Sequence, residues 1–528
     1  MKVPTILFLR FSSTVDLLGK TSTQFVSPSL TSSRNQSTFA VDSAEALDRA
    51  RSFNEIPGPK AFPLMGNLFR YLPLVGEYSK SEWHESQLKK FERYGPIVRE
   101  EIAPGYYMVH LFDPKDMEVV SRNEGKNPKR DFFVAMRMMR ESNPEVYSTA
   151  GVAAANGEDW FHIRRRSQKP MLRPDIMKTY LPQMNVIADD LIRRVRLLRQ
   201  PNHQVPGLIE ELFKWALESV NYILFNERMG CLDDDISPDS LSQQYIQAVN
   251  QFFQLSGKVE LSSLPIWRAY PALSPSYQKL KKVHDFFFEH AMSYVKNKID
   301  EAEKNGGMEV EDPSKLSLME MLLRHGSPRD ASVMAVDALA AGIDTTSLTS
   351  AYVLRNLAAN PRVQKKLQEE VDKNVPRGTA LTVQALDNMH YLKACVKESM
   401  RINPTVQGTS RTLDKDIVVS GYRIPANTLF TLNYNVSSVQ ESHFPNAREY
   451  IPERWLKNES GSNTSSGETF AFVPFGFGPR MCIGRRIAEL EMFTLLTKIM
   501  QNFWIQIIGL NVWKNENYCT TIKVQRKQ

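Results

Sequence analysis

One cysteine, Cys482, lies in a short glycine-rich run, residues 475–484, directly before an apolar helical pattern over about 483–500. Iron binds cysteine as the thiolate. A thiolate needs backbone N–H donors, and glycines let the chain fold closely around a sulfur atom. The N-terminus of the following helix also favours the anion. The run therefore predicts an iron–thiolate loop, and the alternative is a buried structural cysteine in a turn.

The remaining cysteines do not indicate a second kind of site. Cys231, Cys395 and Cys519 lie far from Cys482 and from one another, and no CxxC pair occurs in the sequence. This spacing excludes a disulfide framework and a zinc ribbon, and it is typical of a reducing compartment. Cys482 is therefore interpreted as a lone ligand.

The run around the cysteine resembles the cytochrome P-450 signature FxxGxRxCxG. Phe475, Gly478, Arg480, Cys482 and Gly484 match all of its fixed positions. The resemblance implies a monooxygenase that holds heme b (iron protoporphyrin IX) through Cys482. Phe475 is then placed to shield the sulfur, and Arg480 to meet a heme propionate through a charge-assisted hydrogen bond.

Two more segments, in the expected order before the cysteine, extend the resemblance over most of residues 55–528. Glu398 and Arg401 match the ExxR motif and lie at i and i+3, on one face of a helix. Residues 452–455 resemble a PERF-type motif, with Trp in place of Phe. The resemblance implies that Glu398, Arg401 and Arg454 form a buried ionic triad that locks the cysteine loop.

Residues 341–346 resemble the family's [AG]Gx[DE]T[TS] motif and lie midway along a helical pattern over 328–359. A helix interior does not favour Gly, Asp and two adjacent threonines. We expect local loosening there, which opens a groove above the iron where Asp344 and Thr345 carry protons to dioxygen. The alternative is a helix kink whose polar groups are satisfied locally.

Three further residues are predicted to bind the heme. Trp160 and Arg164 resemble the family's WxxxR helix, whose Trp and Arg reach one propionate. Arg411, ten residues after Arg401, occupies the place of another propionate contact. A Trp and an Arg four residues apart are common on amphipathic helices, so these assignments depend on the other motifs.

The rest of the chain predicts a mostly α-helical, single cytochrome P-450-type domain over residues 41–528, with a small β-sheet region. The heme is expected between the long central helix and the cysteine-carrying loop. Apolar periodicity predicts helices over 176–199, 208–225, 240–256, 276–303, 328–359 and 362–374, strands near 97–102, 106–111, 417–424 and 428–431, and loops at 226–239 and 457–469. The proline-rich stretch 56–66 reads as the hinge where the folded domain begins.

The first forty residues differ in composition from the rest. Residues 1–39 contain fourteen Ser or Thr, four basic residues and one acid, and their longest apolar run, 6–9, ends at Arg10. That run is too short for a signal-peptide core or a membrane span. The composition is typical of a mitochondrial presequence, so residues 1–40 are predicted to be cleaved. The alternative is a tail with no address. Three of the seven net positive charges lie here, so no nucleic-acid partner is needed.

Basic residues suggest the electron donor. Lys393 and Lys397 form a stripe on the ExxR helix, and Arg485 and Arg486 follow the cysteine loop. These features are similar to the mitochondrial group of the family, which takes electrons from an acidic [2Fe–2S] ferredoxin and its NADPH-dependent reductase. We therefore expect the matrix side of the inner mitochondrial membrane. The apolar, aromatic segment 261–270 is either a peripheral membrane contact or a buried loop.

The substrate stays open at this stage. Residues 129–155 and 250–275 are rich in Phe, Met, Leu and Ala and are expected to line the pocket. They suit a sterol or steroid such as an ecdysteroid, and a xenobiotic equally, in keeping with the resemblance to invertebrate members. Two rival classes are a heme-thiolate isomerase or dehydratase that needs no reductase, and a non-catalytic heme or sterol binder. Asp344, Thr345 and the basic patch argue against the isomerase.

Overall fold

The computed structural model describes residues 44–72, 76–79, 82–131, 133–260, 266–304, 316–456, 469–507 and 522–526. The predicted presequence, residues 1–40, lies outside these ranges. Residues 457–468 of the predicted loop 457–469 also lie outside them. No helix in the described part of the chain is both long enough and apolar enough to cross a bilayer.

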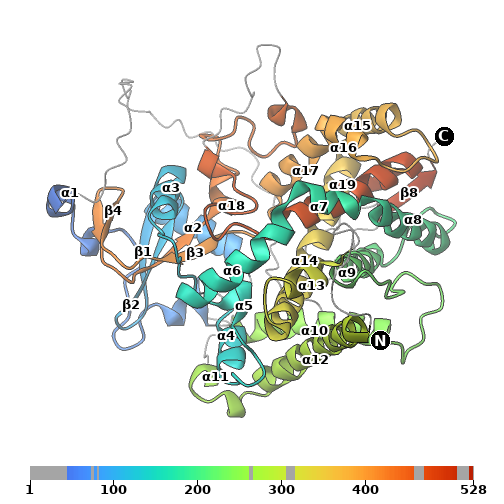
Figure 1. Ribbon diagram of the computed structural model, residues 1–528. Helices are drawn as coiled ribbons and strands as arrows, with labels where there is room; N and C mark the ends of the chain where they lie inside the picture. Colours follow the sequence, from blue (N-terminus) through green and yellow to red (C-terminus); the bar gives the residue numbers. More distant parts are fainter. Residues whose placement is uncertain are drawn as a thin grey trace.

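Helices make up most of the molecule; β1 to β4 lie at one side of it, and β8, which belongs to a separate hairpin, lies at the opposite side near α8 (Figure 1). The α-helices are α1 (Ala44–Arg49), α2 (Trp83–Tyr94), α3 (Pro114–Arg122), α4 (Val134–Glu141), α5 (Gly151–Ala154), α6 (Gly157–Leu172), α7 (Pro174–Thr179), α8 (Leu181–Leu198), α9 (Leu208–Phe225), α10 (Leu241–Glu260), α11 (Ile266–Ala269), α12 (Pro275–Lys304), α13 (Leu318–Leu323), α14 (Pro328–Ala359), α15 (Pro361–Asn374), α16 (Val383–Asn388), α17 (His390–Ile402), α18 (Tyr434–Ser437) and α19 (Arg485–Asn502).

The main sheet has the strand order β1–β2–β6–β3. Its strands and those of two separate hairpins are β1 (Ile97–Ala103), β2 (Tyr106–Leu111), β3 (Thr409–Thr412), β4 (Ile417–Val419), β5 (Tyr422–Ile424), β6 (Leu429–Leu432), β7 (Phe503–Ile507) and β8 (Ile522–Arg526). β1 pairs antiparallel with β2, β2 pairs parallel with β6, and β6 pairs antiparallel with β3. This crossover joins strands that lie some 300 residues apart in the sequence.

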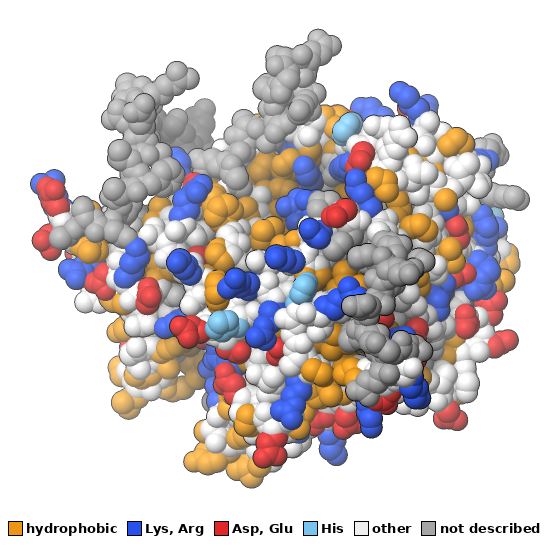
Figure 2. All heavy atoms as spheres, in the orientation of Figure 1, with side chains coloured by type: hydrophobic (Ala, Val, Ile, Leu, Met, Phe, Trp, Pro, Cys, Tyr) orange, Lys and Arg blue, Asp and Glu red, His pale blue; other side chains and the backbone are white. Residues whose placement is uncertain are grey.

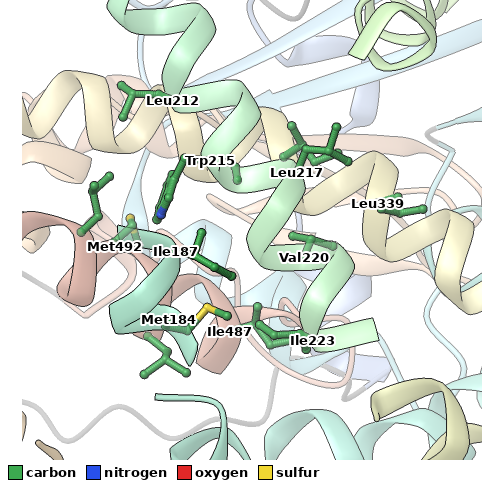
Figure 3. Close-up of a cluster of buried hydrophobic side chains, with 14 of the residues drawn as sticks. Met184, Ile187, Leu212, Trp215, Leu217, Val220, Ile223, Leu339, Ile487 and Met492 are labelled. Atoms are coloured by element: carbon green, nitrogen blue, oxygen red, sulfur yellow. The ribbon is translucent and has the colours of Figure 1, made fainter. Parts of the chain in front are cut away.

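The long helix α14 forms the centre of the helical part, where it packs against α9, α12, α17 and α19. Figure 3 shows the core between α8, α9, α14 and α19, which is built around the buried Trp215. Gly342 permits the closest approach, because a Cβ there would lie 2.9 Å from a methyl carbon of Val220 on α9. α14 is therefore packed against other helices along its length, and few of its side chains remain accessible.

The structure confirms the predicted mostly helical fold with a small sheet, and the patterns at 208–225 and 328–359 match α9 and α14 in both bounds. Two expected elements were wrong in detail. The single helix over 176–199 is interrupted at Tyr180, because Pro182 opens a new first turn at the start of α8. The strand over 417–424 is a hairpin, since positive φ at Ser420 and Gly421 forms a tight turn between β4 and β5.

Candidate active site

The loop that carries Cys482 is held by its own backbone. The Cys482 amide donates to the Phe475 carbonyl at 2.8 Å, and the Met481 amide donates to the Gly478 carbonyl at 3.0 Å. Gly476 and Gly478 both adopt positive φ, near 70°. A Cβ on Gly478 would also lie 2.3 Å from a carboxyl oxygen of Glu124, so this position accepts only glycine.

The sulfur of Cys482 faces an internal hollow. The side chain has solvent-accessible surface, yet burial among protein atoms raises the pKa of its thiol. Both observations hold together only where a side chain lines a cavity inside the fold. The Gly484 N–H and the guanidinium groups of Arg164 and Arg130 act in the opposite direction and lower this pKa. Burial is the larger effect, so the pKa of the free thiol stays raised, while these donors and positive charges partly offset the cost of forming the thiolate.

Four arginines gather beside this hollow, and one of them pairs with a carboxylate. Arg130, Arg164, Arg411 and Arg480 influence one another's charge, and Arg411 forms a buried ion pair with Glu124. Burial, followed by repulsion from Arg130 and Arg411, lowers the pKa of Arg480 to about 8. Burial, followed by repulsion from Arg411 and Arg164, lowers the pKa of Arg130 to about 10. The fold thus holds more buried positive charge than it neutralises.

Several buried polar atoms around the cluster have no hydrogen-bond partner among the described residues. They are Nε of Arg130, Nε of Arg164, the indole nitrogen of Trp160 and one carboxyl oxygen of Glu124. The guanidinium of Arg480 stacks on the Trp160 ring, 4.2 Å from its centre. Uncompensated buried charge is costly. The excess charge and the free donors therefore fit a ligand with two carboxylates, as heme has.

Ala341 and Thr345 lie on the face of α14 that is open to the hollow, since Ala341 is exposed in mid-helix. The Thr345 hydroxyl donates to the Ala341 carbonyl at 2.7 Å. The expected loosening of the helix was wrong, because α14 is unbroken and this local hydrogen bond satisfies the hydroxyl. Asp344 differs: its side chain is 1% exposed, burial raises its pKa to about 7, and Oδ1 has no partner in the described ranges.

The structure brings Glu398, Arg401 and Arg454 together around one buried carboxylate. Arg401 donates to both oxygens of Glu398, at 2.7 and 2.9 Å, and Arg454 Nε donates to Oε1 at 2.9 Å. The Trp455 indole N–H is a further donor, 2.8 Å from Oε2. Arg401 also holds the carbonyls of Ser438 and Ala447, so α17 is tied to the segment that precedes the cysteine loop.

The four predicted basic residues of the electron-donor surface differ in environment. Lys397 is exposed, whereas Lys393 is half-buried and donates to the Asp387 carbonyl. Arg485 and Arg486 both pair with Glu489, which reduces the positive charge they present.

Sequence reasoning missed several of these site residues. Arg130 and Glu124 belong to no motif, and some of their partners lie about 350 positions away. The role of Trp455 could have been predicted from the sequence, because Trp in place of the motif's Phe adds an N–H donor beside the triad.

A cysteine loop below a central helix, beside a cradle of arginines suited to a dicarboxylate, defines the class of heme-thiolate enzymes. The family model described as Cytochrome P450 matches residues 56–521. The chain therefore belongs to the cytochrome P450 family, whose cofactor is heme, and it is a monooxygenase.

Relatives agree over nearly the whole length. The chain is 32% identical to the probable cytochrome P450 301a1, mitochondrial, of Drosophila melanogaster, over 91% of this chain and 87% of that protein. It is 32% identical to cytochrome P450 302a1, mitochondrial, of the same species, over 86% and 90%. It is 31% identical to the probable cytochrome P450 CYP44 of Caenorhabditis elegans, over 87% and 90%.

We expect Arg130→Met to weaken heme retention, because it removes a charged donor from the cradle. A hydrogen bond to a charged group contributes about 1.5–3 kcal/mol, so heme should dissociate roughly tenfold to a hundredfold faster. Transfer of heme to an excess of apomyoglobin measures this rate. Lys129→Met, one residue away, is the matched control and should leave the rate unchanged. Equal rates for wild type and Arg130→Met would contradict a cradle role for Arg130.

Proposed function

We propose that this protein hydroxylates a lipophilic substrate with dioxygen, using electrons from a [2Fe–2S] ferredoxin and its NADPH-dependent reductase. Its place is the matrix side of the inner mitochondrial membrane. The observation that carries the electron-donor assignment is the set of exposed basic residues on α6 and α17, helices that both pack against α19 after the cysteine loop. Relatives whose names include "mitochondrial" support the location.

In this proposal Cys482 is the thiolate ligand of the heme iron, and Phe475 covers the sulfur. Trp160, Arg164, Arg411 and Arg480 hold the propionates, and Arg130 joins them. When bound, heme supplies the chemistry that activates dioxygen. Glu398, Arg401 and Arg454 fix the loop from behind without touching the substrate.

Asp344 and Thr345 supply protons in the same proposal. The pKa of Asp344, raised by burial to about 7, lets its carboxyl hold and release a proton near neutral pH. Thr345 presents its hydroxyl at the hollow while its present acceptor is only a helix carbonyl. If the Thr345 hydroxyl donates to a bound ligand in place of the Ala341 carbonyl, it can pass a proton to that ligand.

The substrate is assigned only by class. The predicted pocket segments 129–155 and 250–275 contribute buried apolar side chains from α4 and α10, among them Met136, Met139 and Phe252. Apolar segments of this kind favour large apolar molecules, which bind through burial of surface rather than through charge. A sterol or steroid such as an ecdysteroid and a xenobiotic both fit this description.

The basic surface extends beyond the four predicted residues. Arg165, Lys169 and Arg173 are exposed on or just after α6, which packs against α19. Figure 2 shows Lys and Arg side chains spread over the face where α6 and α7 lie in Figure 1. Together with Lys397, these side chains form a positive area suited to an acidic ferredoxin.

A hydrophobic edge supports the membrane contact. Leu64 is 93% exposed and Leu273 is 73% exposed. The turn with Leu64 packs on the end of β1, and Tyr106 at the β1–β2 turn lies close enough to Arg268 of α11 to sense its charge. Figure 2 shows hydrophobic side chains along this lower edge, over the β1–β2 turn and α11.

The predicted contact segment 261–270 is only partly described. Residues 261–265 lie outside the described ranges. Trp267 is buried, stacked on Tyr277 and bonded to the Val259 carbonyl, while Arg268 and Tyr270 are exposed. Trp267 therefore fits the interpretation as a buried loop, and Arg268 and Tyr270 fit the interpretation as a membrane contact.

Cys482→His tests the iron ligand. Reduced wild-type protein with carbon monoxide should show the strongly red-shifted Soret band of a thiolate donor. The variant should lose this band while it still binds some heme, because imidazole donates less charge to iron. Cys395→Ser, at a buried cysteine on α17, is the control and should keep it. A red-shifted band in Cys482→His would exclude Cys482 as the ligand.

Leu64→Glu with Leu273→Glu tests the membrane contact. Insertion of two large apolar side chains contributes roughly 3–6 kcal/mol, so the double variant should bind vesicles with anionic lipid at least a hundredfold more weakly. Flotation of the full chain with vesicles measures this. Leu197→Glu, at an exposed leucine on α8, should bind as wild type does. Undiminished binding by the double variant places the membrane surface elsewhere.

Charge reversal tests the electron donor. Lys397→Glu with Lys169→Glu should slow reduction by a mitochondrial-type ferredoxin about tenfold or more at low salt, because attraction becomes repulsion. Wild-type reduction should fall towards the same rate as salt rises. Stopped-flow reduction under carbon monoxide gives the rate. Lys279→Glu with Lys282→Glu on α12 makes the same charge change on another surface and should have no effect. If the two double variants react alike, the donor binds elsewhere.

A further inference from the structure

Glu124 is a buried carboxyl group that contacts both the arginine cluster and the cysteine loop. It lies two residues after α3 and forms an ion pair with Arg411 of β3, and both side chains are almost completely buried. It also lies against Gly478, where an added Cβ would collide with its carboxyl oxygen. A buried guanidinium in contact favours the charged form of a carboxyl group. Glu124 is therefore a negative charge held in place between β3 and the loop that carries Cys482.

The charge of Glu124 acts on more than its direct partner. Burial raises the pKa of its carboxyl group, while the charge and the hydrogen bond of Arg411 lower it. The charges of Arg480 and Arg130 lower it further. Arg130 also interacts with the charge of Cys482. The carboxylate and the cysteine sulfur therefore have a neighbour in common within the arginine cluster.

A second acid near the cluster is less suited to offset its charge. Asp337 of α14 also acts on Arg130, but one of its oxygens accepts from Arg140 at 2.7 Å. Arg140 lies outside the cluster, so it neutralises Asp337 without lowering the charge of the cluster. The partner of Glu124 is itself a member of the cluster, and one Glu124 oxygen has no hydrogen-bond partner among the described residues. Glu124 therefore lowers the net charge of the cluster directly.

The charge around a heme influences how readily its iron accepts an electron. Reduction adds one negative charge, so nearby positive charges favour the ferrous form and nearby negative charges disfavour it. Such effects are larger in a buried site than in water, because the effective dielectric constant is lower. Arginines that hold the propionates therefore raise the reduction potential of the iron, and a carboxylate fixed among them lowers it.

We propose that Glu124 tunes the heme iron: its carboxylate offsets part of the positive charge of the propionate-binding arginines and keeps the reduction potential lower than those arginines alone would set it. Reduction takes up one electron and converts ferric to ferrous iron, and Glu124 keeps its charge throughout. Glu124 is a positioning residue in this role, because it acts through the arginines. The inference rests on the proposed binding of the propionates by Arg411 and Arg480, and it is independent of the ferredoxin assignment.

Glu124→Gln removes the charge with little change in shape. At a fixed electrode potential, the ratio of ferrous to ferric heme should be roughly tenfold higher in this variant than in wild type, because a buried negative charge is lost. Spectroelectrochemical titration of the heme-loaded full chain with redox mediators measures the ratio and needs no substrate, dioxygen or ferredoxin. Glu118→Gln, the same change at a solvent-exposed pair with Arg122 on α3, should leave the ratio unchanged. Equal ratios for wild type and Glu124→Gln overturn the proposal.

Glu124→Asp separates charge from packing. Aspartate keeps the negative charge but is one methylene shorter, so its contact with Arg411 is weakened. The ratio of ferrous to ferric heme should stay within about twofold of wild type at the same electrode potential, even where the variant is less stable. A shift as large as that of Glu124→Gln makes the effect one of packing and overturns the proposal.

Unfolding of the protein with and without heme tests the basis of the proposal. Removal of one partner of a buried ion pair is destabilising, because the other charge is left uncompensated. Propionates at Arg411 supply that compensation, so Glu124→Gln should lower the denaturant midpoint more in the heme-free chain than in the heme-loaded chain. Equal losses in both forms contradict the binding of the propionates by Arg411, and with it the proposal. Unequal losses with an unchanged reduction potential overturn the role of Glu124 alone.

Discussion

Unbalanced positive charge beside one cysteine is the constraint on which the rest of the structure depends. Arg130, Arg164, Arg411 and Arg480 come from a loop, α6, β3 and the cysteine loop, and Glu124 forms a buried ion pair with one of them, Arg411. Buried charges of one sign repel, and their desolvation is costly. The fold can hold this arrangement because each element is anchored elsewhere, and a dicarboxylate ligand relieves the repulsion. Binding of heme and stability of this region are therefore linked.

Two sets of contacts hold these elements in place, one around Glu398 and one along α14. On the far side, Glu398 accepts from Arg401, Arg454 and Trp455, so a single carboxylate ties α17 to the segment before the cysteine loop. On the other side, α14 packs against α9, α12 and α19, and Ala341 is exposed in mid-helix. Packing of this kind fixes the positions of α14 and of the segment before the cysteine loop, and fixed positions are what a catalytic site requires.

Much of the fold could be predicted from local pattern. The bounds of α9 and α14 follow from apolar spacing, since one helix face must be buried along the whole length. The failures have local causes that periodicity does not record. Pro182 begins a new helix after Tyr180, and a tight turn divides the strand that was expected over 417–424. The unbroken helix at Asp344 shows that tertiary packing overrides weak helix propensity.

The sequence by itself determined the chemical class. The residues around Cys482, Glu398 and Asp344 form short motifs, and within a short motif the local backbone conformation alone decides which side chains lie together. Only the tertiary structure decided which buried groups are left without compensation. Arg130 and Trp455 acquire their significance from partners that lie far away in the chain. Burial and the proximity of charges depend on how distant segments meet, and neither the period of a helix nor the spacing of a motif contains that information.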